Sequence, residues 1–167
     1  MRTLILATAV ALAACSSTPK PPQEVRLKFD PNSHRSYFPA GTGEIRGQAF
    51  LRQRDQSGVP CDGSAVIATP ATAFFRQMLD LAARGQMPLI GEAVGPEYIS
   101  IVRLSVCDKD GGFSIAGLPA GDWLVAATVK WVVRGDIQGG LLVYKVRLHP
   151  KETVQVVMTD RDLEVPR

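Results

Sequence analysis

The chain has 167 residues, a length typical of a single domain. Hydrophobic residues make up 46% and charged residues 21%, as in ordinary globular proteins, which excludes disorder along the whole chain. The net charge is only +3 and no lysine or arginine cluster concentrates it, so we expect no nucleic-acid partner. The 15 glycines and 12 prolines favour many turns over a few long helices.

The first residues carry the pattern of an export signal. Arg2 supplies a positive start, and residues 4–12 (LILATAVAL) form an apolar run that is far shorter than the roughly 20 residues needed to span a bilayer. The run ends in a motif that resembles the lipobox of bacterial lipoproteins, Leu12-Ala13-Ala14-Cys15. This resemblance implies that residues 1–14 are a lipoprotein signal peptide and that Cys15 is lipidated. The alternative is an ordinary signal peptide with a chance cysteine.

The same resemblance predicts attachment to a membrane through acyl chains on Cys15, since each buried methylene contributes about 0.8 kcal/mol. Ser16 stands where an aspartate favours retention in the inner membrane of enterobacteria, so we expect the outer membrane. The leaflet and the side that the protein faces stay open. Residues 15–42 are predicted to be a tether and linker, because residues 16–24 (SSTPKPPQE) have no apolar residue besides proline and favour an extended spacer.

The remaining residues, 43–167, have the pattern of β-strands. Six segments alternate apolar and polar residues or form short apolar runs: residues 44–53, 64–69, 98–107, 122–133, 142–148 and 153–159. The strongest alternation starts at Trp123 and places every second residue up to Val133 on one face. Short strands of this kind, separated by glycine-rich turns, predict an all-β fold with an antiparallel sandwich.

One helical insertion, residues 70–96, interrupts these strands. A helix is expected over residues 70–84, with one apolar face formed by Phe74, Phe75, Met78, Leu79 and Ala82. One interpretation is a flap whose exposed face, with Phe74, Phe75 and Met78, binds a partner. The interpretation that we favour is a cover lying over the open end of the sandwich. Residues 85–96 are expected to form a mobile loop.

A motif at residues 107–126 (CDKDGGFSIAGLPAGDWLVA) resembles the signature of carboxypeptidase-regulatory-like domains. The matching positions are Asp108, Gly111 or Gly112, Phe113, Ile115, Leu118, Pro119, Gly121 and Trp123. Trp123 replaces a tyrosine and Ile115 a phenylalanine of that pattern. The resemblance implies a transthyretin-like Greek-key sandwich of about seven strands. Every residue of the motif has a structural role in turns or core, so the motif itself indicates no binding site.

The sequence offers no pattern typical of catalysis or metal binding. Asp108 and Asp110 resemble the start of a calcium loop, but Gly112 and Pro119 stand where such a loop needs oxygen ligands. The two histidines, His34 and His149, are far apart in sequence and neither has a metal-ligand spacing with a cysteine. No nucleophile elbow or phosphate-binding loop is present. We therefore expect a non-enzyme without cofactor or metal.

The cysteines predict one disulfide. Three cysteines less the lipidated Cys15 leave Cys61 and Cys107, an even pair in an oxidising compartment. They precede one predicted strand and end the next, which allows them to meet at one end of the sandwich. The alternative is two separate buried thiols.

Two classes of function remain, with an envelope protein or a glycan as the partner. The first is a structural or protein-interaction module anchored in the envelope. The second is a carbohydrate-binding module, in which Trp131 and Tyr144 would form an aromatic platform if their rings point outward. Both residues belong to faces that otherwise have a core pattern. A third possibility is a secretion-system lipoprotein, because one such family carries a similar sandwich.

Overall fold

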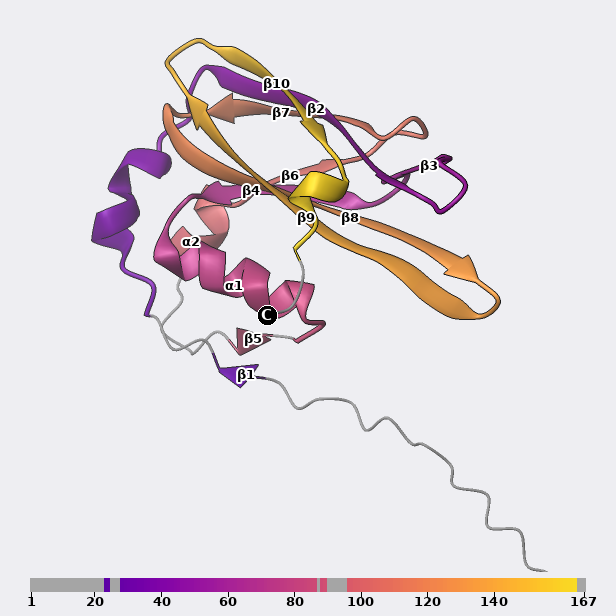
Figure 1. Ribbon diagram of the computed structural model, residues 1–167. Helices are drawn as coiled ribbons and strands as arrows, with labels where there is room; N and C mark the ends of the chain where they lie inside the picture. Colours follow the sequence, from indigo (N-terminus) through magenta and orange to yellow (C-terminus); the bar gives the residue numbers. More distant parts are fainter. Residues whose placement is uncertain (1–22, 25–27, 87, 90–95, 165–167) are drawn as a thin grey trace, which may run out of the picture.

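The computed structural model describes residues 23–24, 28–86, 88–89 and 96–164, and it contains two four-stranded sheets packed face to face (Figure 1). One sheet consists of β10 (Thr153–Met158), β2 (Gly43–Arg52) and β3 (Gly58–Pro60) in that order, with β7 (Gly112–Leu118) also paired to β2. The other has the order β6 (Arg103–Val106), β4 (Ala65–Pro70), β8 (Gly121–Val133) and β9 (Asp136–Leu148). The all-β sandwich is confirmed. Its strand pairs are antiparallel except for β10 and β2, which run parallel.

The main core lies between the two sheets. Ile45 of β2, Leu118 of β7, Trp123 of β8 and Met158 of β10 are completely buried in it. The indole N–H of Trp123 donates a hydrogen bond to the carbonyl of Pro119 at 3.1 Å, so burial leaves no unpaired polar group on this ring. The alternation predicted for the strands that became β2, β8, β9 and β10 is confirmed on this face.

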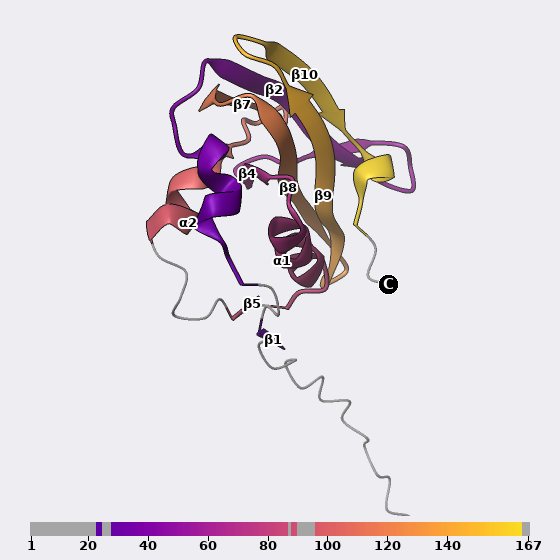
Figure 2. The same cartoon turned by 90° about the vertical axis from the view of Figure 1, so that its left-hand side faces the viewer.

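A second core lies on the outer face of the β6-β4-β8-β9 sheet. That face is covered by α1 (Ala73–Ala83), α2 (Pro96–Ile101) and the 3-10 helix η1 (Pro31–Tyr37), as Figure 2 shows. Phe74 and Phe75 are buried here against Leu124 of β8 and Val143 of β9. The predicted helix exists, but it lies on the sheet face and not over the open end.

The interpretation of this helix as a flap with an exposed partner-binding face is therefore wrong. Phe74 is 5% exposed and Phe75 only 1%, and Met78 packs half-buried against the same cluster. The physical reason is the outward side of β8, where Leu124 and Ala126 are apolar and need a cover. The alternation along β8 predicts its inward face, but it does not indicate that the opposite face is apolar as well.

Two further segments differ from the predictions. The strand expected over residues 98–107 begins as helix α2, for which Pro96 is a favourable first residue, and only β6 is extended. On β6, Leu104 and Val106 are 70% and 63% exposed. In the expected loop, β5 (Pro88–Leu89) pairs in parallel with β1 (Gln23–Glu24), and residues 90–95 lie outside the described part.

The folded body begins before Gly43. Phe29 and His34 are both buried, and their rings stack at a centroid distance of 4.7 Å. His34 Nδ1 lies 2.8 Å from the carbonyl oxygen of Asp30, and His34 Nε2 lies 3.1 Å from the hydroxyl of Thr72 just before α1. The end of the predicted linker is thus part of the second core. The predicted signal peptide and Cys15 lie outside the described residues, within which no helix is long and apolar enough to cross a bilayer.

The predicted disulfide between Cys61 and Cys107 is confirmed. Their Cα atoms are 5.7 Å apart, within the range that such a bond requires. Cys61 follows β3 of one sheet and Cys107 follows β6 of the other. The bond therefore crosslinks the two sheets at one end of the sandwich, and the 46-residue separation encloses the helical insertion.

Candidate ligand-binding groove

Two adjoining pockets lie where β2 ends. The first, of about 420 Å³, lies between the β2–β3 turn and the β8–β9 hairpin and is lined by Arg54 and Trp131, among others. The second, of about 600 Å³, is lined by Tyr144 of β9 and by residues of β10 and of the 3-10 helix η2 (Asp160–Asp162). Arg52 lines both pockets. We call these two pockets together the Arg52 groove.

The β8–β9 hairpin places Trp131 in the groove. Trp131 is half-buried, since one part of the ring packs on the main core, and its backbone pairs with Gln138 of β9. The next residue, Gly139, has a φ of +100°, and a Cβ there would lie 2.1 Å from the carbonyl oxygen of Val129 and 3.0 Å from Cζ3 of Trp131. Only glycine leaves the ring its present place.

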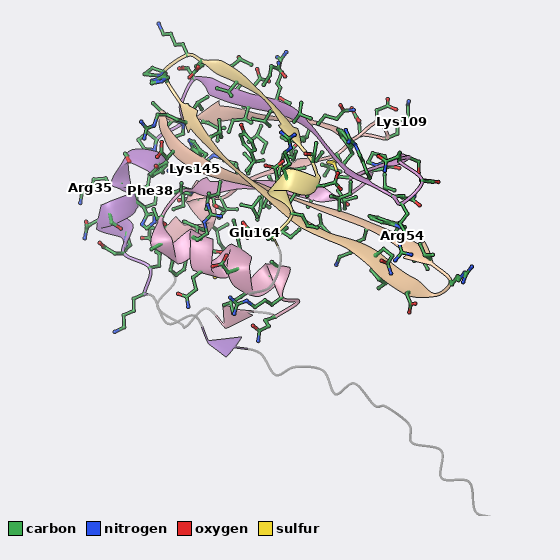
Figure 3. All side chains as sticks on the ribbon, in the orientation of Figure 1. Arg35, Phe38, Arg54, Lys109, Lys145 and Glu164 are labelled. Atoms are coloured by element: carbon green, nitrogen blue, oxygen red, sulfur yellow. A yellow bond between two sulfur atoms is a disulfide. The ribbon has the colours of Figure 1, made fainter. Side chains whose placement is uncertain are left out.

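The C-terminal segment forms the wall of the second pocket. Thr159 and Asp162 form a capping box around η2, and Asp160 Oδ1 accepts a hydrogen bond from the backbone N–H of Arg52 at 3.1 Å. Farther on, the Glu164 carboxylate pairs with Arg76 of α1 at 3.2 Å (Figure 3 labels Glu164 beside α1). These contacts hold the segment across the edge between β9 and β10, next to Tyr144.

Charged side chains of both signs line the groove. They are Arg52, Arg54, Arg134, Arg161, Asp55, Asp136, Asp160 and Asp162; Figure 3 labels Arg54 beside the β8–β9 hairpin. Within the described residues, none of these arginines lies within 4.0 Å of a carboxylate oxygen. The hydroxyl and backbone N–H of Ser57 donate hydrogen bonds to Asp55 and lower the pKa of its carboxyl group.

The structure brings together some of the residues singled out in the sequence. Trp131 and Tyr144 line adjoining pockets, each with one part on the main core. His34 is buried and its ring lies within hydrogen-bond distance of the Thr72 hydroxyl before α1, whereas His149 is exposed at a turn. Asp108 accepts hydrogen bonds from the backbone N–H groups of Asp110 and Gly112, a purely structural role. No three metal-ligating side chains gather in the ranges that the structure covers.

Sequence reasoning missed the charged residues of the groove. Arg52, Arg134 and Arg161 are far apart in the chain, and only the fold unites them. The one local signal was the polar run Arg52-Gln53-Arg54-Asp55, which begins at the last residue of β2 and continues into a turn, where side chains are free to line a site.

No protein-family model matches the sequence, and no curated protein matches it either. Among solved structures, the chain is similar to a candidate carbohydrate-binding protein from Pseudomonas aeruginosa, with a TM-score of 0.62 and 19% sequence identity over 78% of this chain and 97% of that one. Weaker similarity extends to the major pilin subunit of Bacillus cereus (TM-score 0.43, 13% identity, 71% of this chain and 30% of that one). It extends also to the minor pilin of Streptococcus agalactiae (TM-score 0.39, 16% identity, 77% and 48%). The likeness to the Pseudomonas protein shows a common β-sandwich fold.

Proposed function

We propose that this chain binds carbohydrate in the Arg52 groove. The observation that carries the proposal is the placement of Trp131 and Tyr144, each half-buried and each lining one of two pockets that share Arg52. A partly exposed aromatic ring held by the core is a rigid apolar platform with little entropy left to lose. Trp131 pairs with Gln138, six residues before Tyr144 on β9, so the backbones of the two platforms are about 20 Å apart and suit two separated sugar rings of one oligosaccharide.

The polar groups of the groove complement sugar hydroxyls. A hydroxyl group both donates and accepts hydrogen bonds, and the first pocket offers guanidinium donors, the carboxylate acceptor of Asp136 and the amide of Gln138, which does both. Such a combination of aromatic surface with a few convergent polar groups is typical of ligand sites. The fold shared with the candidate carbohydrate-binding protein of Pseudomonas aeruginosa supports the same function.

The proposal includes a place in the cell. The lipobox-like motif at Cys15 supports a non-enzymatic lipoprotein of the bacterial envelope, tethered in the outer membrane, and residues 107–126 support a carboxypeptidase-regulatory-like domain. A protein-interaction module is the alternative, favoured by one observation: Leu104 and Val106 are exposed on β6, an edge strand that pairs only with β4. Binding of glycans or of proteins by the purified chain distinguishes the two.

Trp131→Ala tests the carbohydrate proposal. On an array of envelope and plant-type oligosaccharides, the unmodified full chain binds at least one glycan, and Trp131→Ala weakens that binding by about tenfold or more, because aromatic anchors dominate such contacts. The matched control is Ile137→Ala, which removes an exposed side chain (72%) of the same hairpin that lines neither pocket, and binds as the unmodified chain does. Equal binding by all three proteins contradicts the proposal.

Labelling with palmitate in a bacterial host tests the anchor. We expect the unmodified chain to incorporate labelled palmitate and to fractionate with the outer membrane, and Cys15→Ala to incorporate none, because only a thiol forms the thioether. Equal labelling of the two proteins, or release of the unmodified chain from the membrane fraction, refutes lipidation at this residue.

A further inference from the structure

We infer that the ligand of the Arg52 groove is an acidic saccharide whose carboxylate is bound by the arginines of the groove. This inference rests on the proposed function and specifies the chemical class of the ligand. It comes from the hydrogen-bonding state of the charged side chains and not from their number, because four arginines and four aspartates cancel in net charge.

The arginines of the groove have no partner in the described part of the chain. None of the four guanidinium groups makes an ion pair or a side-chain hydrogen bond there. Most arginines elsewhere in that part do make such a bond, namely Arg35, Arg46, Arg76, Arg103 and Arg147, and Arg84 is the exception. The groove thus gathers guanidinium donors that the fold itself does not use.

The aspartates of the groove are in the opposite state. Asp55 accepts two hydrogen bonds from Ser57, Asp160 accepts the backbone N–H of Arg52, and Asp162 accepts that of Thr159. Of the four aspartates, only Asp136 has a side chain that makes no hydrogen bond with a described residue. The fold therefore occupies part of the acceptor capacity and none of the guanidinium donors, so a ligand that brings acceptors of its own fits best.

A carboxylate is the acceptor that suits these donors. A guanidinium group presents parallel N–H donors that bind the two oxygens of a carboxylate together, and such charge-assisted bonds are among the strongest in proteins. Arg52 lines both pockets, so the pocket of Trp131 and the pocket of Tyr144 share this one guanidinium group. A uronic acid carries its carboxylate on the edge of the sugar ring, where a ring stacked on either platform presents it to neighbouring side chains.

Because the net charge of the groove is zero, selection for an anion acts through direct contact and not through a long-range field. Neutral sugars of the same shape can still stack on the two platforms and form hydrogen bonds with the polar groups of the groove. The inference therefore predicts a difference in affinity between paired ligands, and not an absolute requirement for charge.

Paired oligosaccharides test the inference. The full chain is titrated by calorimetry with oligouronides of galacturonic, guluronic, mannuronic and glucuronic acid, and with the carboxyl-reduced form of each, which carries CH2OH in place of the carboxylate. We expect the acidic member of at least one pair to bind about tenfold or more tightly, equivalent to roughly 1.4 kcal/mol. Arg52→Gln lowers the affinity for the acidic member much more than that for the reduced member and so removes most of the preference, and Arg52→Lys restores part of it.

The control variant is Arg84→Gln, which removes an exposed and unpartnered arginine at the end of α1, outside both pockets. It keeps the full preference for the acidic member. If both members of every pair bind equally, the inference is wrong while carbohydrate binding stands. If no member binds and the glycan array is also empty, the proposed function fails as well. A preference that survives in Arg52→Gln and also in the glutamine variants of Arg54, Arg134 and Arg161 assigns the carboxylate to another site and overturns the inference.

Discussion

Trp123→Ala lowers the free energy of unfolding by about 3–5 kcal/mol, as truncation of a large aromatic residue in a core does. The ring is 0% exposed, packs between the sheets and meets the edge of Tyr37 at a centroid distance of 5.1 Å. Its loss leaves a cavity and also leaves the carbonyl of Pro119 without the indole donor. Urea denaturation followed by far-UV circular dichroism measures the change.

Trp131→Ala is the internal control for that measurement. Trp131 is half-buried at the rim of the core, so its truncation costs clearly less than that of Trp123. A cost below about 1 kcal/mol for Trp123→Ala is inconsistent with a buried ring at this position. It would also place the ring at the surface and reopen the assignment of the aromatic platform.

The double variant Cys61→Ala, Cys107→Ala is expected to lose about 4 kcal/mol of stability, the chain-entropy value for closing a loop of 46 positions. The physical cause is the greater freedom of the unfolded chain once the bond is absent. Denaturation of protein purified without reductant gives the difference, and titration of free thiols counts the cysteines that are unpaired.

Reduction of the disulfide supplies the control. In excess reductant, the stability of the unmodified chain falls to that of the double variant, while the double variant itself is unchanged. Two reactive thiols at Cys61 and Cys107 in protein never exposed to reductant show that the bond does not form in the cell. The same stability with and without reductant contradicts the expected contribution.

The β-sandwich could be predicted from the sequence, because buried residues recur at every second position along β2, β8, β9 and β10. The disulfide could be predicted because Cys61 and Cys107 are an even pair of cysteines in a protein expected in an oxidising compartment. The sequence-based prediction failed where a strand is apolar on both of its faces. The residues Leu124 and Ala126 of β8 are apolar on the face opposite Trp123, which means that this strand is covered on both sides, and a run with two apolar faces does not say what covers the second one.

The groove could be predicted only in part, for a different reason. Trp131 and Tyr144 were recognisable as aromatic residues at the edge of a core pattern, but whether a ring at such a position is covered depends on the neighbouring segment. Here η2 and the β2–β3 turn lie beside the rings without closing over them. Arg52 shares one pocket with Arg134 and the other with Arg161, across long sequence distances that no local pattern encodes.

The indole N–H signals of the two tryptophans test the central claim most directly. In a ¹H–¹⁵N spectrum of the full chain, titrated with its strongest glycan ligand from the array, we expect the Trp131 signal to shift with saturation, because this ring lines the groove. The Trp123 signal stays in place, because its N–H is bonded to Pro119 inside the core. Trp131→Phe assigns the two signals. A saturated complex in which the Trp131 signal does not move would contradict the account and place the carbohydrate elsewhere on the protein.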